Sequence, residues 1–492
     1  MKKTDINLIL SLLYMLWLSA CENPGDAYTV LHRRADIYPD CRGAVIPYNI
    51  APPNFLVREE GRSHLARIAV AGKDSFDVRF KSALNIPLRK WRNLLAENRG
   101  ERLTITVFSR QSSGWVKYSP LALAIAAEPI DPYMAYRLIE PGYEAWGAMG
   151  IYQRRLENFE ETPIMLNSLT DNNCMNCHSF CRHRPDRMLF HMRQKHAGTV
   201  FTDGGKAVKI NTSASPEATA GVYPRWHPGG RYVAFSSNTT RQGFHTAHPN
   251  KIEVYDTKSD LFIYDVQTNT VFTDRLISSE DYFETFPEWS PDGLYLYFCS
   301  AAARAMPALY DSLRYGLLRI PFDPATGSFG KQADTLVSAS ATGKSVALPR
   351  VSPDNRYVVY CMSDYGTFPV WHRESDLYRL DLNDGRITRL DSINSAESES
   401  YHSWSSNGRW MVFGSRRLDG VFTRPYICYF DAEGNAHTPF LLPQQHPLHY
   451  DCSLKSYNIP EFISGKVEIS PRELSAAARG EAMQATDRRR RP

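Results

Sequence analysis

The chain has 492 residues, which is too long for one ordinary domain and predicts two or three. Its apolar fraction of 43% is enough for real hydrophobic cores, and 12% aromatic residues with 31 prolines and 29 glycines favour β-structure rich in turns. The net charge of +4 is small for this length. Such a balance argues against a nucleic-acid-binding protein.

Residues 1–20 predict an export signal rather than part of the fold. Lys2 and Lys3 form a short basic region, and the apolar run that follows has the length of a signal-peptide core, too short to span a bilayer. The run ends in Leu-Ser-Ala-Cys at 18–21, which resembles the lipobox of bacterial lipoproteins. The resemblance implies cleavage before Cys21 and lipid chains on that cysteine. An ordinary signal peptide that happens to precede a cysteine is the alternative.

The residue after Cys21 decides which membrane the resemblance implies. Glu22 stands there instead of the aspartate that most often retains lipoproteins at the inner membrane, so we expect the outer membrane of a Gram-negative bacterium. No other apolar run approaches the length of a membrane span, which leaves lipid as the expected anchor. The expected location is therefore the cell envelope.

Two segments precede the repeats of this chain. Residues 21–60 are Pro-rich and irregular, and predict a tether followed by an extended segment. Residues 61–130 contain short runs in which apolar and polar residues alternate, with helical character only at 89–98. Strands with Gly-containing turns and one interposed helix predict a small β-sandwich-like domain.

A repeated pattern fills most of the remaining chain. Each copy has an aromatic or branched residue, a small turn, and a strand ending in a small or polar residue; the copies are 224–237, 287–300, 349–362 and 402–415. Their turn dipeptides tolerate positive φ, as a type I′ hairpin requires: Gly229-Gly230, Asp292-Gly293, Asp354-Asn355 and Asn407-Gly408. A second hairpin pattern follows each copy. Four strands per unit, repeating every 53 to 63 residues, predict the blades of a propeller.

These repeats resemble the TolB-like β-propeller repeat, whose core reads W-S-P-D-G-R-Y. The resemblance covers about 180–442 and implies a fold rather than a function, because repeats of this kind serve many functions. A fifth copy fits 183–193, and a sixth could be built from 134–156 and closed by 454–462. Pairing of the first and last strands would remove exposed edges.

We therefore expect an all-β chain in which a roughly six-bladed TolB-like propeller occupies 131–462. The remaining residues, 463–492, predict a helix followed by a disordered tail. Four arginines, Arg488 to Arg491, make this tail basic, and such runs are most often solvated.

The run CMNCH at 174–178 is the most informative motif of the chain. Two cysteines three apart, with a histidine directly after the second, form the attachment pattern of one covalent c-type haem. Cys174 and Cys177 can each form a thioether to a vinyl group, and His178 is placed to bind the iron as proximal ligand. This chemistry requires export, which the predicted signal provides. The repeats predict that the motif lies in or just before the innermost strand of a blade, so the haem would sit at one mouth of the propeller channel.

Two alternatives remain for these residues. Cys181 and His183 extend the run to C-x2-C-H-x2-C-x-H, so that Cys174, Cys177, Cys181 and His183 could provide the four ligands of a structural zinc. Zinc–thiolate sites are less expected in an oxidising compartment. The first two cysteines could also form a disulfide or a redox dithiol, but a redox pair of this spacing usually opens a helix in a βαβ unit.

The cysteines outside the lipobox and the haem motif are even in number. They are Cys41, Cys181, Cys299, Cys361, Cys428 and Cys452. Disulfides among them are possible in an exported protein. Because three of them lie in strand-like runs, where buried free thiols are equally plausible, we assign no pairing.

The ligand on the other side of the iron would decide between electron transfer and catalysis. Met188, His191 and Met192 are the leading candidates, and strand alternation would put the two methionines on one face and His191 on the other. Further candidates are Met165, Met175, His183 and His196 near the motif, and His227, His245 and His248 if they line the same mouth. Each methionine could instead be apolar packing, and each histidine a satisfied polar residue.

Two functions compete on these grounds. The first is an exported, lipid-anchored monohaem protein that carries electrons or performs haem redox chemistry with periplasmic or membrane redox partners. The second is a non-enzymatic propeller scaffold that binds a protein or a glycan, with the haem or a zinc in a structural role. No nucleophile-elbow pattern indicates hydrolysis, and nothing in the sequence identifies a substrate.

Overall fold

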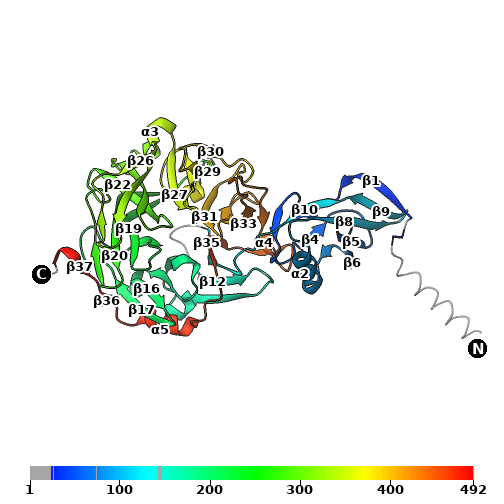
Figure 1. The fold of residues 1–492 in the computed structure, drawn as a ribbon, viewed down its shortest axis with the longest axis horizontal. Helices are drawn as coiled ribbons and strands as arrows, with labels where there is room; N and C mark the ends of the chain where they lie inside the picture. The colour runs from blue at the N-terminus through cyan, green and yellow to red at the C-terminus, as the bar shows by residue number, and fades with distance from the viewer. Residues whose placement is uncertain (1–23, 26, 74, 142–146, 491–492) are drawn as a thin grey trace, which may run out of the picture.

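The computed structural model describes residues 24–25, 27–73, 75–141 and 147–490. The predicted signal peptide and Cys21 lie outside these residues. The described chain is all-β and forms a ring of sheets with a smaller β-rich domain at its outer edge (Figure 1). Among the described residues, no helix is long and apolar enough to cross a membrane.

The small domain contains a seven-stranded sheet, a three-stranded sheet and one helix. The larger sheet consists of β1 (Tyr28–Arg34), β3 (Val45–Pro47), β5 (His64–Val70), β6 (Ser75–Phe80), β8 (Arg102–Gln111), β9 (Gly114–Ser119) and β10 (Leu121–Ala126). The smaller consists of β2 (Ile37–Tyr38), β4 (Phe55–Val57) and β7 (Ala83–Leu84). Helix α2 (Leu88–Glu97) buries Trp91, Leu94 and Leu95, which lie on one helical face.

The boundary predicted between a tether at 21–60 and the domain is wrong. β1 pairs in parallel with β9, and β3 pairs in parallel with β10, so the domain begins at Tyr28. Most side chains of β1 are exposed, and its attachment comes from backbone pairing. A strand held in this way lacks the apolar alternation from which strands are predicted.

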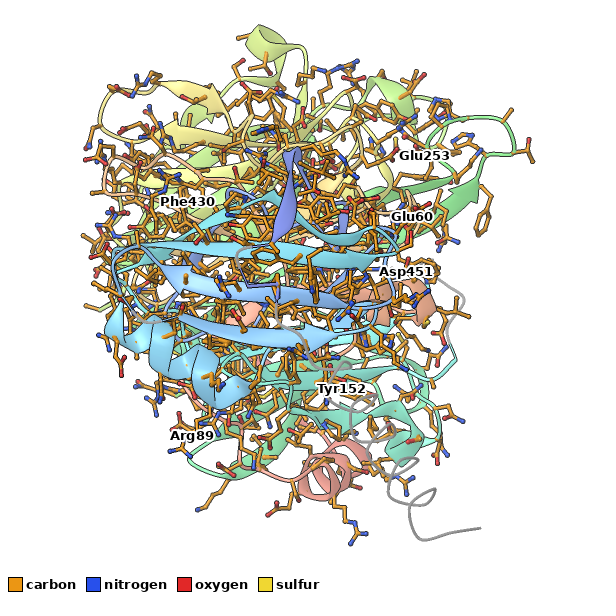
Figure 2. All side chains as sticks on the ribbon, turned by 90° about the vertical axis from the view of Figure 1, so that its right-hand side faces the viewer. Glu60, Arg89, Tyr152, Glu253, Phe430 and Asp451 are labelled. Carbon is orange, nitrogen blue, oxygen red and sulfur yellow. The ribbon has the colours of Figure 1, made fainter. Side chains whose placement is uncertain are left out.

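The small domain lies beside the propeller and not over its centre (Figure 1), and Figure 2 looks onto it with the propeller behind. Tyr38 donates a hydrogen bond to Asp451 over 2.8 Å in the short helix α4 (His449–Cys452). From the propeller side, Tyr429 donates to Glu128 over 3.0 Å. The centre of the ring therefore stays clear of this domain.

Six sheets of four or five strands form the ring in the described part of the chain. In chain order of their innermost strands they are β14 (Met175–Phe180), β15 (Met188–Met192), β16 (Gly198–Asp203), β17 (Lys206–Asn211) and β36 (Met483–Gln484); β18 (Val222–Trp226), β19 (Tyr232–Phe244), β20 (Ile252–Asp265), β21 (Thr270–Phe272) and β37 (Thr486–Asp487); β22 (Tyr282–Trp289), β23 (Tyr295–Ala302), β24 (Gly316–Asp323), β25 (Ser328–Phe329) and β26 (Asp334–Val337); β27 (Ser345–Val351), β28 (Tyr357–Ser363), β29 (Asp376–Asp381) and β30 (Ile387–Arg389); β31 (Glu399–Trp404), β32 (Trp410–Ser415), β33 (Arg424–Tyr429) and β34 (Phe440–Leu441); and β35 (Ser456–Ile463), β11 (Tyr133–Ile139), β12 (Gly150–Arg155) and β13 (Glu161–Leu166).

The last of these sheets closes the ring. Its innermost strand, β35, comes from the C-terminal part of the chain and pairs antiparallel with β11 from the start of the propeller. Phe462 and Ile463 of β35 are fully buried. Closure of this kind leaves no open sheet edge between the first and last sheets.

The predicted turns form, but with a different geometry. In each of the four turns only the second residue has positive φ: Gly230, Gly293, Asn355 and Gly408. A type I′ turn would need positive φ at both positions. The loops are longer than a two-residue turn, since the N–H of each of these residues donates to the carbonyl three residues before it, as from Gly293 to Ser290.

The C-terminal segment is ordered to residue 490, in contrast to the disordered tail expected from its arginines. Helix α5 (Pro471–Arg479) begins with a capping box between Ser470 and Glu473 and packs against β13 and β17. β36 then pairs with β17, and β37 pairs with β21. Arg488 donates to the carbonyls of Gly327 and Thr326 over 2.9 and 2.7 Å, so these arginines bind neighbouring sheets.

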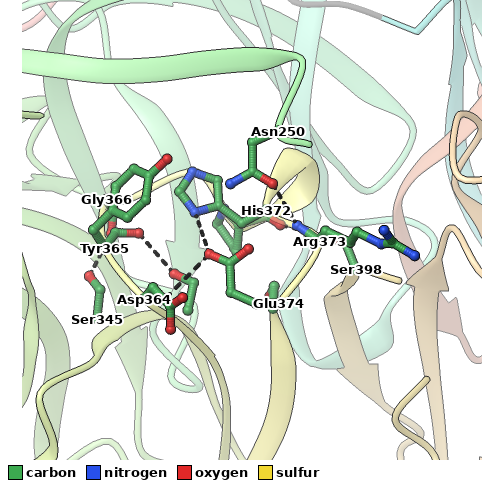
Figure 3. A network of polar contacts seen from close by, with 12 residues as sticks. Asn250, Ser345, Asp364, Tyr365, Gly366, His372, Arg373, Glu374 and Ser398 are labelled. Carbon is green, nitrogen blue, oxygen red and sulfur yellow. Dashed lines mark hydrogen bonds and ion pairs between the residues drawn. The ribbon is translucent and has the colours of Figure 1, made fainter. Parts of the chain in front are cut away.

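A polar cluster ties the long β19–β20 hairpin to the loop between β28 and β29 (Figure 3). The His372 ring lies 3.2 Å from Glu374 and 3.5 Å from Glu253 of β20, and Tyr365 donates to Glu253 over 2.8 Å. Burial disfavours a charged imidazole, but hydrogen bonds to the two carboxylates outweigh it and raise the pKa of His372 to about 9. Burial also works against the Glu374 carboxylate, yet the bond to His372 lowers its pKa to about 2.

We expect this cluster to make the stability of the fold depend on pH in the alkaline range. A raised histidine pKa stabilises the fold fully below its ordinary value of 6.5, and that contribution is lost as the pH rises through about 9. The change is at most about 3 kcal/mol in the free energy of unfolding. Denaturant unfolding of wild type and His372→Gln between these pH values measures it.

The difference between wild type and His372→Gln should shrink as the pH rises. His437→Gln, which alters a more exposed histidine paired with Asp431 over 3.3 Å, is the matched control and should show little change. A stability difference between wild type and His372→Gln that stays constant across the whole range would contradict the assignment.

Candidate functional site

The innermost strands break at the same level of the channel. Each has a shift in its pairing register, and one residue there has a φ between 46° and 54°: Cys177, Tyr223, Phe286, Leu348, Tyr401 and Ile459. None of them is glycine, so each adopts a conformation that L-residues rarely take. Proline follows this residue in four strands, whereas histidine, His178 or His402, follows it in two.

These bulges surround the narrowest part of the channel, a cavity of about 20 Å³. That is room for about one water molecule. Cys177 and His178 line it together with Tyr223 and Phe286 of the next two sheets. The motif therefore lies in the innermost strand β14, on the wall of the central channel.

Two further cavities adjoin this narrowing. The cavity on one side, about 40 Å³, is lined by Cys174 and Cys177 together with Arg137 and Arg193. The pocket on the other side holds about 380 Å³ and shares Arg225 and Arg350 with the narrowing. We refer to this larger space as the mouth pocket. Of the three, it alone has the size of a small-molecule site.

The bulge brings the two cysteines to the same channel. Residues three apart on a regular strand point to opposite faces of the sheet. The register between β14 and β15 shifts after Asn176, at the positive φ of Cys177, and both Cys174 and Cys177 line one cavity. Both thiols are free and buried. Burial raises the pKa of Cys174, and Arg137 and Arg193 oppose that rise.

His178 is a buried imidazole without a hydrogen-bond partner. Its exposed fraction is 2%, and neither ring nitrogen has a partner in the described part of the chain. Burial, followed by the charges of Arg137 and Arg225, lowers the pKa of His178 to about 3. The ring is therefore neutral at pH 7. Leaving such a group unsatisfied is costly, and a neutral imidazole is the form that binds metals.

His402 provides an internal comparison, because it occupies the same position after the bulge in β31. Its Nε2 lies 2.8 Å from the carbonyl oxygen of Val359, and its Nδ1 lies 3.9 Å from the Cys361 thiol. One histidine of the pair is thus satisfied by its own fold, whereas His178 is not. The difference indicates that His178 is kept for a ligand.

The three leading candidates for the second iron ligand lie away from the channel. Met188, His191 and Met192 belong to β15, one strand further out than β14. The two methionines are fully buried in a core cluster that also contains Met165 and Met175. His191 lies 3.1 Å from the Thr199 hydroxyl, and its burial, with a smaller effect of Arg193, lowers its pKa to about 3. None of the three lines the channel cavities described above.

The remaining histidine candidates have partners or lie elsewhere. His183 lines the mouth pocket but lies 2.9 Å from the Phe462 carbonyl, and His196 lies 3.0 Å from Asp171. His227 lies 3.0 Å from the Gly293 carbonyl. His245 and His248 stack near one another by the β19–β20 hairpin, not along the channel.

The zinc alternative finds no support in the geometry. Among the described residues, no group of three or more His, Cys, Asp or Glu side chains could hold a metal ion. Cys174, Cys177 and Cys181 belong to three different core clusters. Strand β14 separates these thiols, whereas a tetrahedral site needs them at one point.

The sequence analysis missed a set of charged residues in the mouth pocket. They stand two residues after each bulge, where the six strands carry Ser179, Arg225, Glu288, Arg350, Ser403 and Glu461. Glu288 lies 3.0 Å from Arg225 and 3.4 Å from Arg350. Burial raises the pKa of Glu288 to about 8 against the opposing charge of Arg225. The sequence signal was present, because this position is charged in four of the six strands.

The sheet topology defines the chain as a β-propeller protein with a Cys-x-x-Cys-His run on the wall of its channel. No protein-family model and no curated protein matches it.

Several solved structures resemble the chain weakly. A DUF4784 family protein from Bacteroides caccae is 9% identical, with a TM-score of 0.29 over 74% of this chain and 94% of that one. The periplasmic gluconolactonase of Pseudomonas aeruginosa is 13% identical, with a TM-score of 0.33 over 64% of this chain and 97% of that one. The tricorn protease is 12% identical, with a TM-score of 0.29 over 68% of this chain and 33% of that one. Likenesses at this level carry no argument about function.

Proposed function

We propose that the chain is a monohaem c-type propeller protein, exported and lipid-anchored at Cys21, that acts in periplasmic electron transfer or haem redox chemistry. The observation that carries the proposal is His178, a buried neutral imidazole with both ring nitrogens unpartnered, directly after Cys177. An oxidising compartment and a Cys-x-x-Cys-His run are the two conditions that c-type attachment needs. The TolB-like character of the repeats is part of the same proposal.

The residues present fit this group. Cys174 and Cys177 would hold the haem through thioethers, since both thiols are free and border one cavity. His178 would bind the iron on one side. The bound haem would supply one-electron redox chemistry at the channel. Because the cavity beside the thiols measures about 40 Å³, the channel must widen to admit a macrocycle.

The protein around the motif contributes electrostatics and exclusion of water. Arg137 donates to the carbonyl of Met175 over 2.9 Å and so supports β14 next to the motif. The cations of Arg137 and Arg225 disfavour protonation of His178 and keep it available as a ligand. Guanidinium groups near a redox centre also favour its electron-rich state.

His178→Ala should keep the covalent haem but change its spectrum, because the thioethers stay and the imidazole ligand is lost. Absorption spectra of oxidised, reduced and CO-treated protein, purified from a host that attaches c-type haem, measure the change. His402→Ala is the matched control, since it alters the equivalent buried position without touching the motif. Identical spectra for wild type and His178→Ala would contradict the assignment of the ligand.

The same spectra separate electron transfer from catalysis. Binding of CO to the reduced wild-type protein would indicate an open coordination position and favour catalysis. An iron closed on both sides would favour electron transfer.

A further inference from the structure

The mouth pocket has features of a binding site that the proposed haem does not use. It lies across the narrowing from the cavity that both thiols border. Its volume of about 380 Å³ is in the range of small-molecule sites. It is lined by side chains from all six innermost strands, so the closed ring holds its walls in fixed positions.

Two charged groups on its wall are buried and incompletely paired. Glu461 is 8% exposed; its Oε1 accepts from the backbone N–H of Phe180 over 3.2 Å, and its Oε2 has no partner in the described part of the chain. Arg350 is also 8% exposed and has an unpartnered Nε. Buried charged groups left unsatisfied are expensive, so each needs a ligand atom of the opposite kind.

The distribution of charge defines that ligand. Arg225 and Arg350 flank the single carboxylate of Glu288, so the two guanidiniums exceed their one shared partner and can accept an anion. Glu461 carries no ion pair to a cation among the described residues, and it can accept an ammonium. A molecule with an anionic and an ammonium group would satisfy both.

The remaining wall is apolar and fixed in place. The indole N–H of Trp289 donates to the carbonyl of Arg225 over 3.1 Å, and that of Trp404 donates to the carbonyl of Arg350 over 3.3 Å. These bonds join each ring to the strand of the preceding sheet. The rings of Trp226 and Phe180 add to the same wall.

We propose that the mouth pocket binds a small zwitterion with an apolar side chain, that is, an amino acid with a free amino and a free carboxylate group. Its carboxylate would bind Arg225 and Arg350, its ammonium group would bind Glu461, and its side chain would lie against the indoles. This site goes beyond the proposed haem function and does not depend on it.

The test is calorimetric titration of the purified full chain with three probes. L-Phenylalanine carries both charges, phenylpropionate lacks the ammonium group, and phenethylamine lacks the carboxylate. We expect phenylalanine to bind about tenfold or more tightly than either analogue, since each lost contact is a charge-assisted hydrogen bond. Equal affinity of phenylalanine and phenylpropionate, or no saturable binding of any probe, would overturn the proposal.

Two variants assign the contacts. Glu461→Gln should remove the preference for phenylalanine over phenylpropionate, and Arg350→Gln should remove the preference over phenethylamine. Arg319→Gln, which alters an ion pair with Asp334 away from the pocket, should leave all three affinities unchanged. Unchanged preferences in both pocket variants would also overturn the proposal. Repeating the titration on the haem-free Cys174→Ala/Cys177→Ala protein separates the two claims, because binding there survives a failure of the haem proposal.

Discussion

Replacing Cys174 and Cys177 together by alanine should abolish covalent haem attachment while the propeller stays folded. Both thiols are needed for the two thioethers, and without them only His178 would hold the haem, through a reversible bond. The measurement is the pyridine haemochrome of protein that has been denatured and washed. Protein from a host with the c-type attachment machinery should retain haem as wild type and lose it as the double variant.

Cys181→Ala is the matched control for this experiment. Cys181 belongs to the same run and is buried, but it packs in a different core cluster and does not line the channel cavities. It should retain covalent haem at the wild-type level. Equal haem retention by the double variant and wild type would show that the thiols are not the attachment points.

Ending the chain at residue 455 should abolish cooperative folding of the propeller. This truncation removes β35, the only partner of β11 on that side, and with it the buried Tyr457, Phe462 and Ile463. Burial of three such side chains is worth about 5–9 kcal/mol in total, which is comparable to the whole stability of many proteins. The exposed edge of β11 would also favour aggregation. Thermal unfolding followed by circular dichroism measures the loss.

A chain ending at residue 465 is the control for this truncation. It keeps β35 and the closed ring but lacks α5, β36 and β37, which lie on outer strands. We expect it to fold cooperatively with a lower midpoint. If the shorter and the longer truncation unfold alike, β35 does not close the propeller.

The propeller could be predicted from sequence because its repeats are local. The aromatic residue, turn and strand of each copy lie within about fifteen residues, as in 287–300, and turn chemistry fixes their order. The pairing of β11 with β35 could be expected only from the need to close the ring, since more than 300 residues separate the two strands. Strand β1 could not be found, because a strand held by backbone pairing leaves no apolar pattern.

The site was less predictable, for a specific physical reason. The spacing of the motif predicted the residues, but the positive φ of Cys177 decides that Cys174 and Cys177 share a cavity. Propensities give no warning of such a conformation in a cysteine. A signal existed in the other repeats, where a proline follows the bulge residue in four strands and marks this position. The methionines of β15 were misjudged because distance along the chain says nothing about which strand faces the channel.

The haem content of the mature wild-type protein tests the account most directly. The protein should be expressed with its own export signal in a host that attaches c-type haem, denatured, freed of non-covalent haem, and assayed by pyridine haemochrome and intact mass. We predict one covalent haem per chain, held by two thioethers. Mature protein that carries no covalent haem in a host proven to load another c-type cytochrome would contradict the central claim.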